Sequence, residues 1–283
     1  MKNKKKILLI AIPVAILLVG WIIWGNTALM VSELAIQNEK IPDSFDGFRI
    51  AQISDLHNAE FGEDNEKLIG VLKECKPDII LITGDLIDSR NTDIEIGISF
   101  AEKAVMIAPT YYVTGNHEAR ISEYEQLIEG IESAGVQILE NESVVLEQSG
   151  ECITIAGVAD PSFTTDYLFG DSETVTSDIL SELLVSEESY TVLLAHRPEL
   201  FEVYVDSKVD LVFSGHAHGG QFRLPFIGGV VAPNQGLFPE YDAGLYTKDD
   251  TSMVVSRGIG NSILPFRINN RPEIVLVKLE SED

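Results

Sequence analysis

Short apolar runs alternate with amphipathic segments along the first half of the body of this chain. The runs have the length of buried strands and lie at 48–54, 78–83 and 111–114. Apolar residues at helical spacing between and after them predict helices over 64–75, 92–106 and 122–134. Strands separated by helices of this length are joined by right-handed crossovers and pair in parallel.

The pattern changes in the second half of the chain. Three short β runs, separated by turn residues, predict an antiparallel portion at 135–139, 144–147 and 152–159. An acidic helix over 171–186 and further strands follow, the latter at 190–194, 210–213, 252–256 and 273–279. We therefore expect an α/β fold (α+β mixed sheets) with helices outside two sheets, in a single domain over 47–283.

The N-terminus has a different pattern. Residues 7–24 carry no charge, and as a helix they would extend about 27 Å, close to the thickness of a bilayer core. We expect a cytoplasmic basic N-terminus at 1–6, a transmembrane signal anchor at 7–25 and a connector at 26–46. The four lysines before the anchor favour a single-pass protein of the cell membrane with its main domain, 47–283, outside the cytoplasm. Whether the anchor is cleaved stays open.

Charge narrows the range of partners. The chain has 45 acidic against 20 basic side chains and a formal net charge of −25. A body this acidic repels nucleic acid, so no nucleic-acid partner is expected. The two cysteines, Cys75 and Cys152, lack the spacing of a zinc site, and we expect buried free thiols rather than a disulfide.

Polar side chains that bind metals cluster where the predicted strands end. All five histidines of the chain lie at such positions, with two aspartates and an asparagine. Imidazole, carboxylate and amide donors without thiolate suit Mn, Fe, Zn or Co. Seven potential ligands are enough for two divalent metal ions that share one carboxylate. The seven are Asp55, His57, Asp85, Asn116, His196, His216 and His218.

These residues also form an ordered set of motifs. The motifs are Asp55-x-His57, Gly84-Asp85, Gly115-Asn116-His117-Glu118, His196 and Gly215-His216-x-His218. The set resembles the calcineurin-like metallophosphoesterase superfamily over residues 49–221. The flanking segments 45–50 and 219–225 resemble its membrane-anchored bacterial phosphodiesterase branch.

The resemblance implies a four-layer αββα sandwich and a role for each residue. Asp55, His57 and His218 would hold one ion, and Asn116, His196 and His216 the other, with Asp85 bridging. A hydroxide between the ions would attack phosphorus. His117 would then act as the catalytic acid, or as a cation, at the leaving oxygen, with Glu118 or a nearby carboxylate as support.

The expected function is therefore a metal-dependent phosphoester hydrolase that uses a dinuclear metal centre, and more narrowly a phosphodiesterase or pyrophosphatase acting on an envelope or lipid-linked substrate. Two alternatives stay open: a phosphomonoesterase for a soluble nucleotide or protein, and a non-catalytic metal-binding membrane protein. Arg223 is the expected phosphate contact, ahead of Arg90, Arg120 and Arg197. The sequence leaves the metal, the substrate and the oligomeric state undecided.

Overall fold

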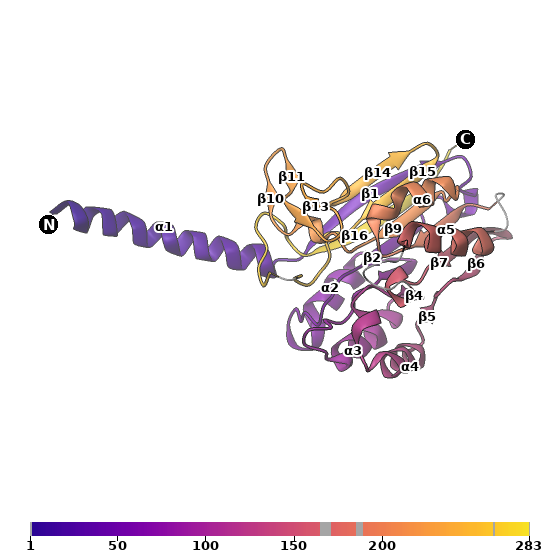
Figure 1. Ribbon diagram of the computed structural model, residues 1–283, viewed down its shortest axis with the longest axis horizontal. Helices are drawn as coiled ribbons and strands as arrows, with labels where there is room; N and C mark the ends of the chain where they lie inside the picture. The colour runs from indigo at the N-terminus through magenta and orange to yellow at the C-terminus, as the bar shows by residue number, and fades with distance from the viewer. Residues whose placement is uncertain (1, 165–170, 185–188, 263, 283) are drawn as a thin grey trace.

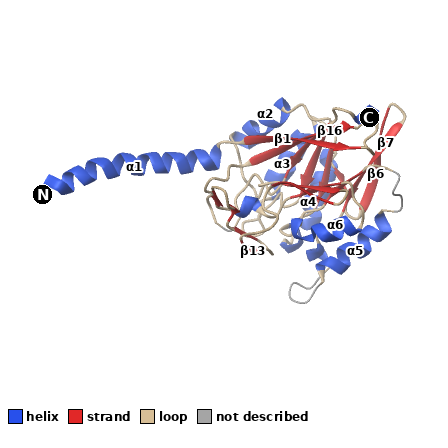
Figure 2. Ribbon diagram, turned by 90° about the horizontal axis from the view of Figure 1, so that it is seen from above, coloured by secondary structure: helices blue, strands red, loops and turns tan. Residues whose placement is uncertain are grey.

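Two six-stranded sheets face each other in the computed structural model, with helices on their outer sides (Figure 1). The structure describes residues 2–164, 171–184, 189–262 and 264–282. Seen from above, the strands lie between α2 on one side and α5 and α6 on the other (Figure 2). The prediction of an α/β fold with two mixed sheets is confirmed.

The first sheet holds most of the N-terminal half of the body. Its order is β1 (Met30–Asn38), β16 (Glu273–Ser281), β2 (Arg49–Ile53), β3 (Ile79–Thr83), β4 (Thr110–Val113) and β5 (Gln137–Ile138). Strands β2 to β5 are parallel, and β16 runs antiparallel to β2. Three helices connect the parallel strands, namely α2 (Glu66–Glu74), α3 (Ile94–Val105) and α4 (Tyr124–Ala134).

The second sheet is built from the C-terminal half. Its order is β14 (Gly244–Lys248), β15 (Thr251–Val255), β9 (Leu211–Ser214), β8 (Thr191–Leu194), β7 (Glu151–Gly157) and β6 (Glu142–Gln148). The predicted antiparallel portion is confirmed for β6 and β7, whereas β5 joins β4 in parallel. Helices α5 (Ser172–Leu183) and α6 (Phe201–Asp206) belong to this half. The predicted end of the acidic helix, 185–186, lies outside the described residues.

Three apolar cores separate the four layers. Along β3, Ile79 and Leu81 face the second sheet, while Ile80 and Ile82 pack against the helices of the first. A strand buried on both faces needs apolar residues at every position, which explains the continuous runs in the sequence. The third core joins the second sheet to α5 and α6. The layer order is therefore α, β, β, α.

Three parts of the body differ from expectation. The segment 26–46 is more than a connector, because it contains β1, which pairs in parallel with β16 along its whole length. Helix α6 and strand β14 were not predicted. Cys75 is buried as expected, but Cys152 is exposed, and both are free thiols.

Helix α1 (Lys2–Thr27) extends away from the body (Figure 1). Apolar side chains along it, from Leu9 to Trp24, are largely exposed. Among the helices of the described residues, none reaches the length and apolarity required to cross a bilayer. The transmembrane segment expected at 7–25 therefore stays a prediction.

Two small hairpins lie on the side of the body from which α1 leaves (Figures 1 and 2). They are formed by β10 (Arg223–Leu224) with β11 (Gly228–Gly229) and by β12 (Val231–Ala232) with β13 (Gly236–Leu237). The hairpins and the turns beside them expose several large apolar side chains, namely Leu224, Phe226, Ile227, Leu237 and Phe238.

Candidate metal centre

All seven predicted ligands and His117 follow the carboxyl ends of strands, as expected. In the first sheet, Asp55 and His57 follow β2, and Asp85 follows β3. Asn116 and His117 follow β4. Strands β8 and β9 of the second sheet lead into His196, His216 and His218. Loops that leave the same edge of a parallel sheet converge. Here the edges of two sheets meet, so each sheet supplies part of one site.

Buried polar contacts hold the two edges together. The side-chain amide of Gln52 donates to Thr83 Oγ1 and to the carbonyl of Ser214, both at 2.9 Å. His196 Nδ1 lies 2.7 Å from the carbonyl oxygen of Thr83, so Nδ1 carries the proton and Nε2 is left as a ligand. Gly84 is required at this junction: its φ is +90°, and a Cβ would lie 2.6 Å from His196 Nδ1.

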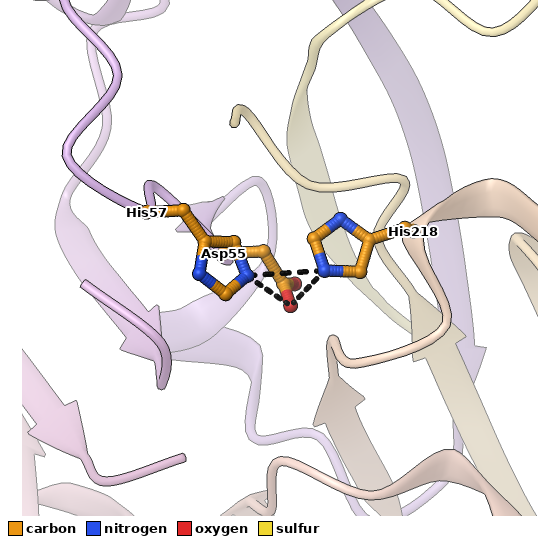
Figure 3. A group of neighbouring side chains, drawn as sticks. All are labelled: Asp55, His57 and His218. Atoms are coloured by element: carbon orange, nitrogen blue, oxygen red, sulfur yellow. Dashed lines mark hydrogen bonds and ion pairs between the residues drawn. The ribbon is translucent and has the colours of Figure 1, made fainter. Parts of the chain in front are cut away.

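The first group of potential ligands is Asp55, His57 and His218 (Figure 3). The Nε2 atoms of the two histidines are 3.1 Å apart. His218 Nε2 lies 3.3 Å from Asp55 Oδ1, and His57 Nε2 lies 3.9 Å from it. All three side chains are buried.

The second group is Asp85, His196 and His216. His196 Nε2 lies 3.2 Å from His216 Nδ1 and 3.2 Å from Asp85 Oδ2. The same Asp85 oxygen is 3.5 Å from His57 Nε2 in the first group. Asp85 thus stands between the two groups, where a bridging carboxylate would be needed.

The donor atoms fit divalent ions. Metal–ligand bonds of about 2.0–2.2 Å at tetrahedral or octahedral angles place neighbouring donors about 3 Å apart, close to the separations within each group. Asn116 Oδ1 is buried without a hydrogen-bond partner among the described residues, as expected of an oxygen that awaits a cation. Asn116 also lines the same cavity as Asp85, His216 and His218.

Burial sets the protonation of most of these groups. It lowers the pKa of His57 to about 4 and that of His216 to about 3, so both rings are neutral at pH 7 and available as ligands. Burial also raises the pKa of Asp55 to about 6. For His196, burial would lower the pKa, but the charge of Asp85 outweighs it and raises the value to about 10. Without metal, His196 and Asp85 therefore form an ion pair.

The backbone is strained where the ligands lie. Five of them have positive φ angles, which non-glycine residues rarely adopt: Asp55 53°, His57 46°, Asp85 54°, His216 62° and His218 48°. Each such residue costs about 1–3 kcal/mol, and strain of this kind gathers at functional sites. In the loop after β2, Asp55 and His57 both belong to the first group, whereas His216 and His218, from the loop after β9, belong to different groups.

His117 lies at the edge of the two groups, and its ring meets that of His57 edge to face at 4.4 Å between centroids. The backbone N–H of Ser89 donates to His117 Nδ1 at 3.0 Å, which places the proton of the neutral ring on Nε2. Asp88 Oδ1 is 3.5 Å from the same Nδ1. Burial lowers the pKa of His117, and the charges of Asp85 and Asp88 oppose that shift.

Glu118 is buried beneath the loops that carry the ligands. Its carboxylate accepts hydrogen bonds from the backbone N–H groups of Asp85 at 3.0 Å, Leu86 at 2.7 Å and Gly115 at 2.8 Å. It therefore ties the loop after β3 to the loop after β4. Burial and the charge of Asp85 raise the pKa of Glu118 to about 8, against the effect of these donors. Glu118 therefore contacts the site through the backbone N–H groups of these two loops.

A cavity of about 230 Å³ opens over the two groups. Arg90 and Arg120 line it, but Arg223 is not among its described lining residues. The guanidinium of Arg223 instead lies 3.1 Å from Asp242. The geometry thus gives no support to Arg223 as the phosphate contact, because an ion pair in another part of the fold holds it.

Arg197 likewise does not line this cavity among the described residues. It forms a buried two-point ion pair with Asp160 at 2.7 and 2.9 Å. The sequence reasoning missed other residues near the ligands. Asn234 Oδ1 lies 3.2 Å from His216 Nε2, and Ser89 and Asp88 contact His117. Ser89 and Asp88 come from a turn with no motif of its own. Asn234 lies in a glycine-rich segment, 227–266, whose composition suggested a part of the pocket wall but no role for a single residue.

Comparison with known proteins agrees with this geometry. YkuE, an uncharacterized metallophosphoesterase of Bacillus subtilis, is 32% identical over 88% of this chain and 85% of its own length. The phosphodiesterase YaeI of Escherichia coli is 30% identical over 82% of each chain. A transmembrane protein with a metallophosphoesterase domain from Danio rerio is 29% identical over 88% of this chain, which spans 57% of that protein.

The family model of the calcineurin-like phosphoesterases matches residues 48–220, more than half of the chain. The match contains every strand end that carries a potential ligand. The chain is therefore a metallophosphoesterase, a hydrolase of phosphoric esters, and belongs to the calcineurin-like phosphoesterase family.

Proposed function

We propose that this metallophosphoesterase hydrolyses phosphodiesters at two divalent ions, with Mn, Fe or Zn as the candidates. Asp55, His57 and His218 would hold one ion. The other would be held by Asn116, His196 and His216, with Asp85 shared. The observation that carries this proposal is the position of Asp85 Oδ2, 3.5 Å from a nitrogen of the first group and 3.2 Å from one of the second.

When bound, the ions would supply positive charge to a phosphate and would lower the pKa of a water molecule toward neutrality. The chain supplies the rest. The Nε2–H of neutral His117 can donate to a phosphate or leaving-group oxygen, because the Ser89 N–H occupies Nδ1. When the ring is protonated, the carboxylate of Asp88 stabilises it and the ring can give a proton to the leaving oxygen. Arg90 and Arg120 add positive charge to the wall of the cavity.

The shape of the site favours a substrate with an apolar part. A second cavity of about 290 Å³ adjoins the first and shares His218, Pro233 and Ser262 with it. Its remaining wall is mostly apolar and includes Val231, Ala232 and Leu264. A lipid-linked phosphodiester could place its phosphate over the ligand groups and the start of its apolar chain in this second cavity.

Location at the cell membrane, with the catalytic body outside the cytoplasm, is part of the proposal. The exposed apolar side chains of α1 support it, as do the exposed Phe226, Ile227, Leu237 and Phe238 beside the same end of the body. The printed name of the Danio rerio relative describes a transmembrane protein. A body held at the membrane would meet lipid-linked substrates at high effective concentration.

The first experiment tests the reaction. The full chain in neutral detergent is stripped of metal, resupplied with Mn, Fe, Zn or Mg, and assayed with an aryl phosphate diester and the matching monoester. We expect metal-dependent turnover that favours the diester. Preference for the monoester would support the phosphomonoesterase alternative. Binding of two ions without turnover of either ester would support the non-catalytic alternative.

The second experiment tests the apolar cavity. Leu264→Gln places an amide in its wall and should lower kcat/KM for a long-chain phosphodiester on the order of 10-fold, with little change for the aryl diester. Leu245→Gln is a matched control, because Leu245 is a similarly exposed leucine on β14. Equal losses for both substrates would refute the lipid-linked assignment but leave the reaction class intact.

A further inference from the structure

A third cavity lies at the base of α1, where the helix meets the body. It measures about 250 Å³ and shares no lining residue with the two cavities beside the ligand groups. Trp21 and Trp24 of α1 form one wall, and Arg257, Arg267 and Arg271 of the body form another. No aspartate or glutamate is among its described lining residues. In a chain with a net charge of −25, this is an unusual local surplus of positive charge.

Neutral partners hold two of these arginines, Arg267 and Arg271, in position, whereas Arg257 lies beside the carboxylate of Glu273. Arg271 donates to the backbone carbonyls of Ala28 and Leu29, and its guanidinium carbon lies 4.7 Å from the ring centroid of Trp24. Arg267 is 1% exposed and donates to the carbonyls of Arg257 and Gly260. Carbonyl oxygens and a ring fix the direction of a guanidinium without cancelling its charge.

Two donors in this wall have no partner. The Nε atoms of Arg257 and Arg267 are buried and form no hydrogen bond with any described residue. Glu273 Oε1 is 3.6 Å from Arg257 Nε, too far for a hydrogen bond, and the Glu273 carboxylate already accepts from Ser32 and from the backbone N–H of Arg257. A buried, charged donor without a partner is costly, and an anion in the cavity would relieve that cost.

We propose that this cavity binds the phosphate headgroup of an anionic phospholipid. Three arginines suit the oxygens of a phosphate. The apolar side chains of α1 lead away from the cavity and offer a path for acyl chains. Trp21 and Trp24 line the cavity, and tryptophans are enriched at membrane interfaces. The site is separate from the proposed catalytic centre and would orient the body against the membrane.

The two tryptophans are the only ones in the chain, so their fluorescence reports on this cavity directly. The full chain in neutral detergent is titrated with dihexanoyl phosphatidylglycerol, dihexanoyl phosphatidylcholine, or inorganic phosphate. We expect a saturable change with phosphatidylglycerol at much lower concentration than with the other two. Equal affinity for inorganic phosphate would refute the lipid as the source of the anion, and no saturable change with any probe would refute the site.

A double variant, Arg257→Gln with Arg271→Gln, should weaken phosphatidylglycerol binding about 10- to 100-fold through loss of charge-assisted hydrogen bonds. Lys248→Gln with Lys278→Gln removes the same charge from exposed ion pairs and should bind like the unaltered chain. Arg257→Lys, which keeps the charge, should bind phosphatidylglycerol more tightly than Arg257→Gln does. Equal loss in both single variants would indicate a folding defect. Unchanged binding by the double variant would refute the proposal.

Metal-stripped protein should bind the lipid as well as the metal-loaded protein does. Because this readout requires no turnover, failure of the lipid site and failure of the proposed hydrolase can be told apart.

Discussion

The cavity over the potential ligands and the cavity at the base of α1 have similar volumes, about 230 and 250 Å³, but opposite chemistry. Carboxylates and imidazoles lie at the base of the first, and burial keeps several of them neutral, while Arg90 and Arg120 also line it. The second gathers guanidinium groups, which stay charged. The first is therefore suited to cations and the second to anions. Local partners, and not the net charge of −25, therefore decide which charge each cavity can accommodate.

The largest expected effect concerns His117, which lines the cavity over the potential ligands and is assigned to proton transfer. His117→Ala should lower kcat about 10²- to 10⁴-fold while metal content stays unchanged. Metal content is measured by elemental analysis of the same preparation, and lipid titration at the cavity at the base of α1 should be unaffected. Turnover equal to that of the unaltered chain would remove His117 from the mechanism.

Glu118 tests whether the first cavity depends on the backbone beneath it. Glu118→Gln removes one acceptor from a set of backbone N–H donors and should reduce metal affinity about 10- to 100-fold. Calorimetric titration with Mn measures the affinity. Glu132→Gln, at an exposed position on α4, serves as the control. Unchanged affinity would show that the loops after β3 and β4 hold their positions without this carboxylate.

The two cavities should also respond differently to pH. Because Asp85 raises the pKa of His196 to about 10, His196 is protonated at pH 7 without metal and must release that proton to bind an ion. Metal affinity should therefore fall as pH decreases from 8 to 6, by about 10-fold per pH unit for one proton released. Titrations in two buffers with different ionisation enthalpies count the protons. Lipid binding to the arginines should not change, and a metal affinity independent of pH would contradict the ion pair.

The smallest expected effect concerns the cavity at the base of α1. Trp24→Leu keeps an apolar side chain but removes the ring beside Arg271, an interaction worth about 0.5–1 kcal/mol. Phosphatidylglycerol binding, followed through Trp21, should weaken about 2- to 5-fold. Trp21→Leu, followed through Trp24, provides the reciprocal measurement. A loss as large as that of the arginine double variant would mean that the ring, and not the charge, dominates binding.

The residues around the cavity over the potential ligands were predicted from the sequence, and those of the cavity at the base of α1 were not. Asp55, His57, Asp85 and the others were found because each follows an apolar run, and strand ends converge whatever their separation in sequence. Arg257 also follows a strand, β15, but Arg267 and Arg271 do not, and all three meet α1 only through tertiary packing. Arg223 shows the same limit: it is close to His218 in sequence, yet an ion pair with Asp242 decides its position.

The fold shows a similar division. Strands buried on both faces, such as β3, were predicted from their continuous apolar residues. Strand β1 was not, because only Ile36 of its nine residues is buried and its pattern does not differ from that of a connector. Pairing with β16, more than 240 residues away in sequence, makes it a strand. Non-local pairing of this kind leaves little trace in local periodicity.

That pairing also has a consequence for the order in which the protein is made. Strand β16 lies between β1 and β2, so two strands near the beginning of the chain are joined by a strand near its end. During synthesis from the N-terminus, β1 has no neighbour in the sheet until residues 273–281 have left the ribosome. The first sheet can therefore be completed only once residues 273–281 have been made, and until then the edge of β2 stays open to pairing with other chains.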